Sequence, residues 1–344
     1  MQAIMIKEFV KDLSELQPSN VSLPKPKGAQ DVLVKVTHVA VTHVDTLYAR
    51  GLHQNNKRHM KPPFTLGTEF SGIVTSAPSS RHFRPGDRVF GGDSAYAEYI
   101  SLDEKLLRKV PSSWSNVQAC AVGASGAVSY GSLMVMGKLK AGETALILGA
   151  SGGLGVMAVQ IAKAVGAKVI ATVGSKEKAE VIRRIGADAV VNYKDANWED
   201  QVKALTDDGE GVHVVYDAIG AIESSLKCLR YRGRVVIVGF VARDGDIEKI
   251  RANRILLKSA SVIGYRFGED GRRLGAQQTE SVWEGFMKLV NEGSITPVIY
   301  NEGEYNGLHT IPRAMSDLLA GKTVGRSVVT ITEESKIETA KTKL

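Results

Sequence analysis

A short apolar run that stops abruptly in glycine constrains this chain more than any other feature. Residues 146–148 are Leu-Ile-Leu, residues 149–155 contain four glycines, and residues 156–164 carry apolar side chains at helical spacing. This order predicts a buried strand, a tight turn and a helix. Because glycine has no Cβ, such a turn can bring its backbone and the helix N-terminus against a phosphate group. The segment is therefore a candidate phosphate-binding site.

The residues around this turn alternate between apolar runs and amphipathic segments. Such alternation predicts parallel strands joined by helices, which form a doubly wound α/β sheet. We expect six strands, at residues 146–148, 169–173, 189–191, 212–217, 234–239 and 261–264.

The first third of the chain has a different texture, with short strands and turns. Strands are expected at residues 32–36, 72–74, 88–90 and 96–100, which together indicate a small β-barrel-like domain. Alternating helix and strand begins near Val117. After the six-stranded region, a helix near 282–290 and a last strand at 325–331 are expected to return to the first domain.

Composition excludes several classes of protein. The two cysteines, Cys120 and Cys228, are too few for a disulfide framework, which favours a reducing compartment. The net charge of +7 comes from scattered residues, so nucleic acid is not the expected partner. Residues 145–173 are mostly apolar, but glycines and a changing periodicity break them up, so no membrane span is expected.

The end of the second strand indicates which dinucleotide the sheet would bind. An NAD-binding sheet has Asp or Glu at this point, and here the sequence continues Gly174-Ser175-Lys176-Glu177-Lys178. Ser175 can donate a hydrogen bond to a 2′-phosphate and the lysines can neutralise it, whereas Glu177 is expected to point aside. We therefore expect NADP(H). The expected cofactor-binding residues are Ser151, Gly152, Gly153, Leu154, Gly174, Ser175, Lys178, Gly239 and Phe240.

Taken together, these segments resemble the medium-chain dehydrogenase/reductase superfamily, and within it the zinc-free, zeta-crystallin-like NADPH:quinone oxidoreductases. The resemblance spans nearly the whole chain. Its motifs are Val44-Asp45-Thr46, Gly67-Thr68-Glu69-Phe70-Ser71-Gly72, Arg84-Pro85-Gly86-Asp87-Arg88-Val89, the glycine turn, Val191-Asn192-Tyr193 and Asn253-Arg254-Ile255-Leu256-Leu257-Lys258.

The resemblance implies a GroES-like catalytic domain, residues 1–122 and 266–344, with an inserted Rossmann domain, residues 123–265, and an active site in the cleft between them. It also implies that Lys178 and Tyr193 hold the 2′-phosphate. Zinc-dependent relatives have Cys at the position of Thr42, His at that of Thr68 and a further Cys near Ala124. Because catalytic zinc needs about three good ligands, no metal site is expected.

Chemistry without a metal favours acceptors that spread negative charge onto an oxygen, which hydrogen-bond donors can stabilise. We expect the donors among Thr42, Tyr48 and Thr68. Many quinone reductases have Asn at the position of Thr42 and Tyr at that of Leu47, so Tyr48 is one residue late. On a strand, that shift would turn its side chain to the other face. Asp45 is expected to brace the local backbone.

Three functions remain open. The first is an NADPH-dependent reductase of quinones or α,β-unsaturated carbonyl compounds. The second is an enoyl-thioester or long-chain enone reductase with the same chemistry, and the third is an NADPH-binding protein with a non-catalytic role such as RNA binding. The resemblance implies a homodimer. The expected location is the cytoplasm, with the peroxisome as the alternative because Thr342-Lys343-Leu344 differs by one residue from Ser-Lys-Leu.

Overall fold

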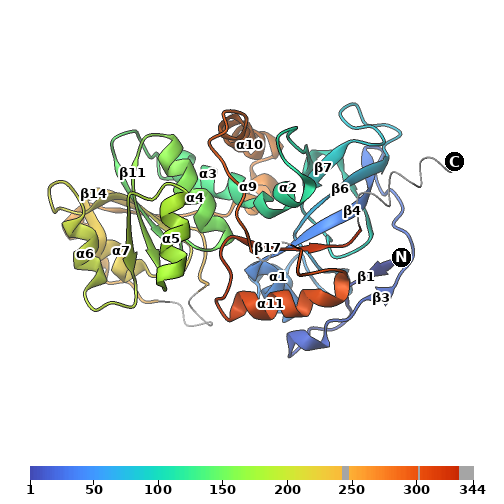
Figure 1. The fold of residues 1–344 in the computed structure, drawn as a ribbon, viewed down its shortest axis with the longest axis horizontal. Helices are drawn as coiled ribbons and strands as arrows, with labels where there is room; N and C mark the ends of the chain where they lie inside the picture. Colours follow the sequence, from blue (N-terminus) through green and yellow to red (C-terminus); the bar gives the residue numbers. More distant parts are fainter. Residues whose placement is uncertain (242–247, 301–302, 333–344) are drawn as a thin grey trace. The chain divides into compact units, whose positions relative to one another are not determined.

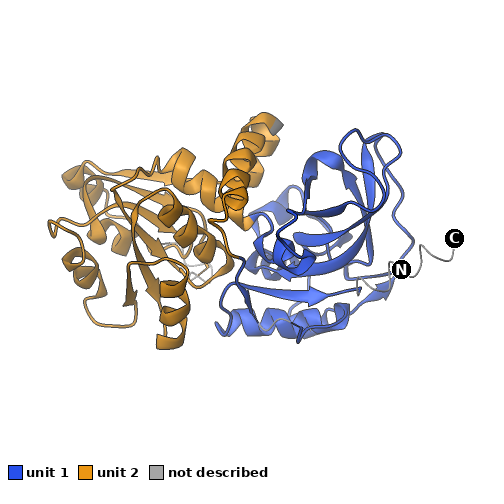
Figure 2. Cartoon of the chain, turned by 45° about the horizontal axis from the view of Figure 1, so that its top comes forward, with its two compact units in different colours: residues 1–124, 297–344 blue, residues 125–296 orange. Residues whose placement is uncertain are grey.

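The chain forms two compact units (Figure 2). The computed structural model describes residues 1–241, 248–300 and 303–332. Unit 1 comprises Met1–Ala124 and Pro297–Leu344, and unit 2 comprises Ser125–Thr296. The first boundary lies close to the expected one. The second does not, because residues 266–296, assigned from sequence to the catalytic domain, lie in unit 2.

Residues 266–296 belong to unit 2 because they pack on its helix of residues 125–130: a Cβ at Gly126 would lie 2.1 Å from the Phe286 ring, and a Cβ at Gly285 would lie 2.4 Å from the Tyr130 ring. The segment forms α9 (Phe267–Arg273) and α10 (Ala276–Asn291), which is longer than the expected helix. The ring of Trp283 lies 6.3 Å from that of Phe267 and 6.2 Å from that of Phe286. At the end of the segment, the Gln160 side chain donates to the Thr296 carbonyl at 3.0 Å and accepts from its amide at 2.7 Å.

Unit 2 contains the predicted parallel sheet. Its six strands are parallel and lie in the order β12-β11-β10-β13-β14-β15, so the doubly wound architecture is confirmed. All five residues of β10 are buried, as expected for a strand with a helix layer on each face. The strands are β10 (Thr144–Leu148), β11 (Lys168–Val173), β12 (Ala189–Asn192), β13 (Val212–Asp217), β14 (Leu229–Ile237) and β15 (Ser261–Gly264).

Helices connect these strands, and α4 and α5 pack against β11 (Figure 1). The apolar stretch 145–173 is divided into β10, α4 and β11. A different helical stretch, Asn116–Met136, is long and apolar enough to cross a membrane, but 67% of its most apolar window is buried in the protein, as in a core helix. The remaining helices are α3 (Ser125–Tyr130), a π-helix (Gly131–Met136), α4 (Gly153–Ala164), α5 (Lys176–Arg184), α6 (Trp198–Ala204), α7 (Ile222–Cys228) and α8 (Ala252–Lys258).

Unit 1 is built on a seven-stranded sheet with the order β16-β17-β4-β6-β7-β9, and β8 also pairs with β4. The late strand β17 lies antiparallel to the early strand β4 (Figure 1), so the chain does return to its first domain. The expected strand at 96–100 begins later, at Tyr99. The strands are β4 (Asp31–Val41), β6 (Glu69–Ser76), β7 (Arg88–Gly91), β8 (Tyr99–Asp103), β9 (Leu107–Lys109), β16 (Ile299–Tyr300) and β17 (Arg326–Thr330).

Short helices and two small ribbons complete unit 1. The helices are α1 (His43–Ala49), α2 (Asn116–Val122) and α11 (Ile311–Leu319), and the ribbons pair β1 (Gln2–Ala3) with β3 (Ser19–Asn20) and β2 (Met5–Ile6) with β5 (Phe64–Thr65). The core between them contains the buried side chains of Val34, Val36, Phe70, Val89 and Val329.

Candidate functional site

The carboxyl ends of the parallel strands in unit 2 form one edge of the sheet. The chain runs outward from β10 to β11 and β12 and then returns to β13 on the other side of β10. Ligands of doubly wound sheets bind at this switch point. Every cofactor-binding residue predicted from the sequence follows one of these strand ends, so the structure brings them to the same edge.

The glycine turn has the geometry that its sequence predicts. Gly149 has a φ of +66°. The helix α4 begins at Gly153, and its N-cap residue, Gly152, makes no side-chain hydrogen bond to the first turn. A Cβ at Gly155 would lie 2.6 Å from the Cα of Ala150, so helix and turn are in direct contact. The amides of a first helical turn lack intrahelical partners and suit an anion. The turn therefore fits a pyrophosphate.

Two residues that sequence reasoning missed lie near this turn: Ser129 bonds to its helix, and Asp217 holds the neighbouring loop after β13, whose Ile219 packs against Gly149. The Ser129 hydroxyl donates to the carbonyl of Leu154 at 2.9 Å and lies 3.0 Å from the Tyr216 hydroxyl. The buried Asp217 carboxylate accepts from the amides of Ile219 and Gly220, and burial raises its pKa. Asp217 ends an apolar strand, which was a signal in the sequence, whereas nothing local marked Ser129.

The end of β11 carries the residues expected at a 2′-phosphate. A Cβ on Gly174 would lie 2.7 Å from the Tyr193 hydroxyl oxygen, so only glycine lets that ring pack there, with 48% of Tyr193 exposed. Ser175 caps α5 and accepts from the Lys178 amide at 3.4 Å. Burial lowers the pKa of Lys178, and the nearby positive charge of Lys194 lowers it further. Sequence reasoning missed Lys194, and the two ammonium groups suit a dianionic phosphate.

Glu177 does not point aside as expected. Its carboxylate accepts a hydrogen bond from the Ser175 hydroxyl, which lowers the pKa of Glu177. The carboxylate reaches the hydroxyl because both belong to the first turn of α5, where residues two apart in a capping segment can meet. Ser175 thus has a local partner at the position predicted to bind the phosphate.

Gly239 and Phe240 follow β14, next to the loop after β13. A Cβ at Gly239 would lie 2.8 Å from the carbonyl oxygen of Ala218, so this segment packs closely on that loop. The Phe240 side chain is 42% exposed. An exposed aromatic ring at the carboxyl edge of such a sheet is available to a ligand.

A second group of predicted residues meets in unit 1. Thr42 caps α1, and its hydroxyl lies 3.2 Å from the hydroxyl of Thr68, the residue before β6. The Thr42 hydroxyl donates to Oδ2 of Asp45 at 2.7 Å, and this oxygen also accepts from the Thr42 amide at 2.9 Å and from the Tyr96 hydroxyl at 2.9 Å. Thr42, Asp45 and Tyr96 are buried, and Thr68 is partly exposed. We call these four residues the hydroxyl cluster.

Tyr48 lies on a helix rather than on the strand assumed in the sequence analysis. Residues 43–49 form α1, because the Thr42 cap and Asp45 start a helix there. A shift of one residue then rotates a side chain by about 100° instead of reversing it. The Tyr48 hydroxyl accepts from the Asn55 amide nitrogen at 3.0 Å, and its ring packs against His53 with centroids 4.5 Å apart.

Glu69, the neighbour of Thr68, belongs to a buried ion pair. The Arg326 Nη2 lies 3.2 Å from its Oε1 and 3.1 Å from its Oε2, and the Ala124 amide donates to Oε1 at 3.2 Å. The pair connects β6, the end of α2 and β17. This arrangement fits the structural role expected for Glu69.

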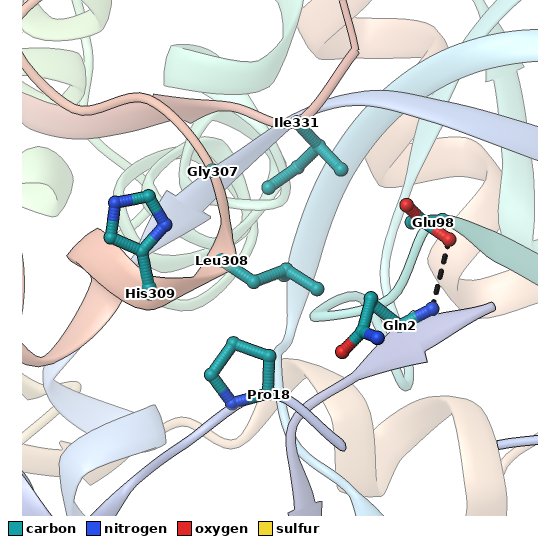
Figure 3. A pocket seen from close by; sticks show the side chains of 7 residues that line it. All are labelled: Gln2, Pro18, Glu98, Gly307, Leu308, His309 and Ile331. Atoms are coloured by element: carbon teal, nitrogen blue, oxygen red, sulfur yellow. Dashed lines mark hydrogen bonds between the residues drawn. The ribbon is translucent and has the colours of Figure 1, made fainter. Parts of the chain in front are cut away.

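One surface pocket lies elsewhere in unit 1. This pocket of about 310 Å³ is open at the surface beside Gln2, whose amide donates to Glu98 Oε2 at 2.8 Å (Figure 3). None of the predicted site residues contributes to it. Its lining consists of Gln2, Pro18, Glu98, Gly307, Leu308, His309 and Ile331.

The chain is similar to known oxidoreductases over both units. Residues 28–112 match the model of the alcohol dehydrogenase GroES-like domain, and residues 153–291 match that of the zinc-binding dehydrogenases. A quinone oxidoreductase-like protein 2 homolog of Nematostella vectensis is 34% identical over 88% of this chain and 82% of its own. The mouse quinone oxidoreductase is 32% identical over 93% of this chain and 95% of its own.

Solved structures give the same result. The structure of Escherichia coli quinone oxidoreductase complexed with NADPH superposes with a TM-score of 0.84, at 28% identity, over 96% of this chain and all of that one. The predicted combination of a GroES-like domain with a Rossmann sheet is therefore confirmed.

The zinc in the name of one matching model does not fit the residues present here. In the described part of the chain, no group of three or more His, Cys, Asp or Glu side chains could hold a metal ion. The hydroxyl cluster offers hydroxyls and a carboxylate oxygen that already accepts several hydrogen bonds. Cys120 and Cys228 are both buried thiols, and burial raises the pKa of Cys228 to about 12. Such a donor set lacks the thiolates and imidazoles of catalytic zinc.

Proposed function

The chain belongs to the medium-chain dehydrogenase/reductase superfamily, in its quinone oxidoreductase group, and from this premise we propose that it reduces quinones or α,β-unsaturated carbonyl compounds with NADPH and without a metal. The observation that carries the proposal is the end of β11, where Tyr193 packs on Gly174, Lys178 and Lys194 lie near each other, and the strand does not end in the acidic residue of NAD-binding sheets.

Each group of predicted cofactor residues would bind a different part of the dinucleotide. The turn of Ser151, Gly152, Gly153 and Leu154 would bind the pyrophosphate through backbone amides, and Gly174, Ser175, Lys178 and Tyr193 would hold the adenosine 2′-phosphate. Gly239 and Phe240 would contact the nucleotide further along the same edge. The bound dinucleotide supplies the hydride, and the protein orients it against an electrophilic carbon of the acceptor.

A turnover assay tests this function. NADPH oxidation is measured with 9,10-phenanthrenequinone and with a simple enone, and we expect stoichiometric oxidation with at least one of them. Preference for a long-chain enoyl thioester would favour the second function considered from the sequence. Tight NADPH binding without turnover of any acceptor would reject the proposal and favour a binding role.

Cofactor preference gives a sharper prediction. Replacing Lys178 with alanine should raise the KM for NADPH about 10- to 100-fold, because a charge-assisted hydrogen bond contributes about 1.5–3 kcal/mol. The KM for NADH, which lacks the 2′-phosphate, should hardly change. Lys176→Ala, two residues away on the same helix, is the matched control. An equal loss for both nucleotides in the Lys178 variant would contradict a 2′-phosphate contact.

We also propose a homodimer formed through β15, the last strand of the parallel sheet. Its residues are only half-buried or exposed, and Leu256 and Leu257 on the preceding helix α8 are 79% and 74% exposed. Among the described residues β15 pairs only with β14, and such a strand edge beside exposed leucines is a typical surface for association.

Changing this surface should change the molecular mass in solution. The Leu256→Glu and Leu257→Glu double variant should elute as a monomer in size-exclusion chromatography with light scattering, and the unmodified protein as a dimer. Leu205→Glu, at a 38% exposed leucine after α6, should not alter the mass. A monomeric unmodified protein at micromolar concentration would exclude this dimer.

The cytoplasm remains our proposed location. The residues of the alternative peroxisomal signal, Thr342 to Leu344, lie outside the described part of the structure. Fluorescent fusions at the N-terminus, with and without these three residues, would distinguish the two compartments: import that depends on the tripeptide would overturn the cytoplasmic assignment.

A further inference from the structure

We propose that Asp45 acts as a positioning residue that holds a proton for the reaction and passes it through Thr42 to the Thr68 hydroxyl, which donates it to the reduced acceptor. This inference rests on the proposed reductase function, in which the acceptor must gain one proton together with the hydride. It names Thr68 as the group that touches the substrate.

The hydrogen bonds of Thr42 are fully used inside the protein. Its hydroxyl donates to Asp45 Oδ2 at 2.7 Å and accepts from the Asp45 amide at 3.2 Å. Its second lone pair faces the Thr68 hydroxyl at 3.2 Å. A hydroxyl has one hydrogen and two lone pairs, so this inventory is complete. Thr42 is thus suited to relay a proton within the cluster. Its role as a direct hydrogen-bond donor to the acceptor, expected from the sequence, stays a prediction.

Thr68 is the member of the cluster that a substrate can reach. It is partly exposed, whereas Thr42, Asp45 and Tyr96 are buried. While Asp45 is ionised, the Thr42 hydroxyl donates to Oδ2, so Thr68 is the donor in the 3.2 Å contact between the two threonine hydroxyls, and its hydrogen is directed at the Thr42 oxygen. Thr68 then presents only lone pairs outward and cannot stabilise an oxyanion. A donor role for Thr68 requires a protonated Asp45.

The position of the proton on Asp45 follows from its surroundings. Oδ1 is buried and has no hydrogen-bond partner, so a proton there would have no acceptor. A proton on Oδ2 finds the Thr42 oxygen 2.7 Å away. Burial raises the pKa of this carboxyl group, and the hydrogen bonds from Thr42 and Tyr96 oppose that rise. The acid is therefore easier to protonate than an exposed aspartic acid.

Apart from the Tyr96 hydroxyl, the charged groups described on the neighbouring elements bond to partners other than Asp45. The Tyr96 hydroxyl faces Asp45, and the Glu69–Arg326 pair acts on Tyr96 from β6 and β17. On α11, which packs against α1, Arg313 donates to the Glu304 carbonyl, and Asp317 bonds to Tyr305 and Lys322. The carboxyl group of Asp45 is thus the acid at the inner end of the hydrogen-bond chain.

The proton transfer balances in one concerted shift. The Oδ2–H bond of Asp45 breaks as an O–H bond forms on Thr42, whose own hydrogen passes to Thr68. The former hydrogen of Thr68 bonds to the acceptor oxygen, which carries the negative charge left by hydride addition. Asp45 ends ionised and the product neutral. Water at the exposed Thr68 restores the proton by the reverse path.

The pH dependence of turnover tests the proposal. For the unmodified protein, kcat should be highest when Asp45 is protonated and should fall as the pH rises through its pKa. Asp45→Asn has no proton to give, so its kcat should drop about 100-fold and lose this pH dependence. Thr68→Val should lose a similar factor, and Thr68→Ser should restore most of it. Thr68→Val with unchanged turnover, or Asp45→Asn with the original pH profile, would overturn the proposal.

Tyr96 provides a variant that does not remove the acid. Its hydroxyl stabilises ionised Asp45, so Tyr96→Phe should move the fall of kcat upward by about one pH unit. Tyr305→Phe is the matched control, because Tyr305 is also buried in unit 1 and donates to Asp317 at 2.7 Å. A purely structural role for Asp45 predicts no shift in either variant, and that result would count against the relay.

A measurement without turnover separates this inference from the proposed function. Because the folded pKa of Asp45 is raised above its ordinary value of 3.8, protonation stabilises the fold below that pH, and the contribution is lost as the pH rises through the folded pKa. The Tm of the unmodified protein should therefore fall relative to that of Asp45→Asn over this range. A constant Tm difference overturns the proton-holding role, whereas a protein that turns over no acceptor overturns only the proposed function.

Discussion

Replacing Gly155 with alanine should destabilise the fold and nearly abolish NADPH binding. The added Cβ would lie 2.6 Å from the Cα of Ala150, which is backbone and can give way only if the glycine turn moves. Overpacking of this kind costs about 1–3 kcal/mol. A displacement of about 1 Å at a binding turn can cost a further 100-fold in function. We expect a fall of about 2 kcal/mol in the free energy of unfolding and a Kd for NADPH at least about 100-fold higher.

Two other glycines show which part of this effect belongs to the fold. At Gly152, a Cβ would be 3.6 Å from the nearest atom, so Gly152→Ala should keep its stability and lose only NADPH affinity, because the methyl group would stand where the phosphate approaches. At Gly268 in α9 the nearest atom is 3.9 Å away, and Gly268→Ala should change neither quantity. Denaturant unfolding and fluorescence titration measure the two. Normal NADPH affinity in Gly155→Ala would show that the turn does not bind the pyrophosphate.

Breaking the buried ion pair in unit 1 should cost still more stability. Arg326→Met leaves the Glu69 carboxylate in the protein interior without its cationic partner, and removing one member of a buried pair typically costs about 3–5 kcal/mol. The double variant Glu69→Gln with Arg326→Met should lose less than the sum of the single variants, because it leaves no buried charge. Lys203→Met, at the exposed pair Lys203–Asp200, should cost at most about 0.5 kcal/mol.

Loss of the Glu69–Arg326 ion pair should loosen both chain segments of unit 1. Arg326 lies in β17 and Glu69 in β6, 257 residues away, and Glu69 also holds the Ala124 amide. Hydrogen exchange should therefore rise in both β6 and β17 of the Arg326→Met variant. Unchanged exchange in β6, or a single-variant loss no larger than that of Lys203→Met, would show that the pair does not connect them.

The sequence predicted the parallel sheet well because its signals are local. Apolar runs, glycines at turns and helical spacing each act over a few residues, and they located all six strands of unit 2 within a few residues. The same local reading found the turn at Gly149 and the missing acid after β11. It failed at residues 43–49, which were assumed to be a strand but form α1, because Thr42 and Asp45 cap a helix there. It also separated α9 and α10 from unit 2, since aromatic packing partners cannot be read from spacing.

For this protein, the sequence alone determined the strand–turn–helix unit and its expected ligand, NADP(H). Glycine spacing and the absence of a carboxylate after the second strand can be read at single positions. Only the tertiary structure decided which distant side chains meet. It placed Tyr193 on Gly174, paired Glu69 with Arg326, and directed the hydroxyls of Thr42 and Tyr96 at one oxygen of Asp45, with the Thr68 hydroxyl next to that of Thr42. These contacts depend on strand register and helix packing, which long-range burial sets and no local pattern records.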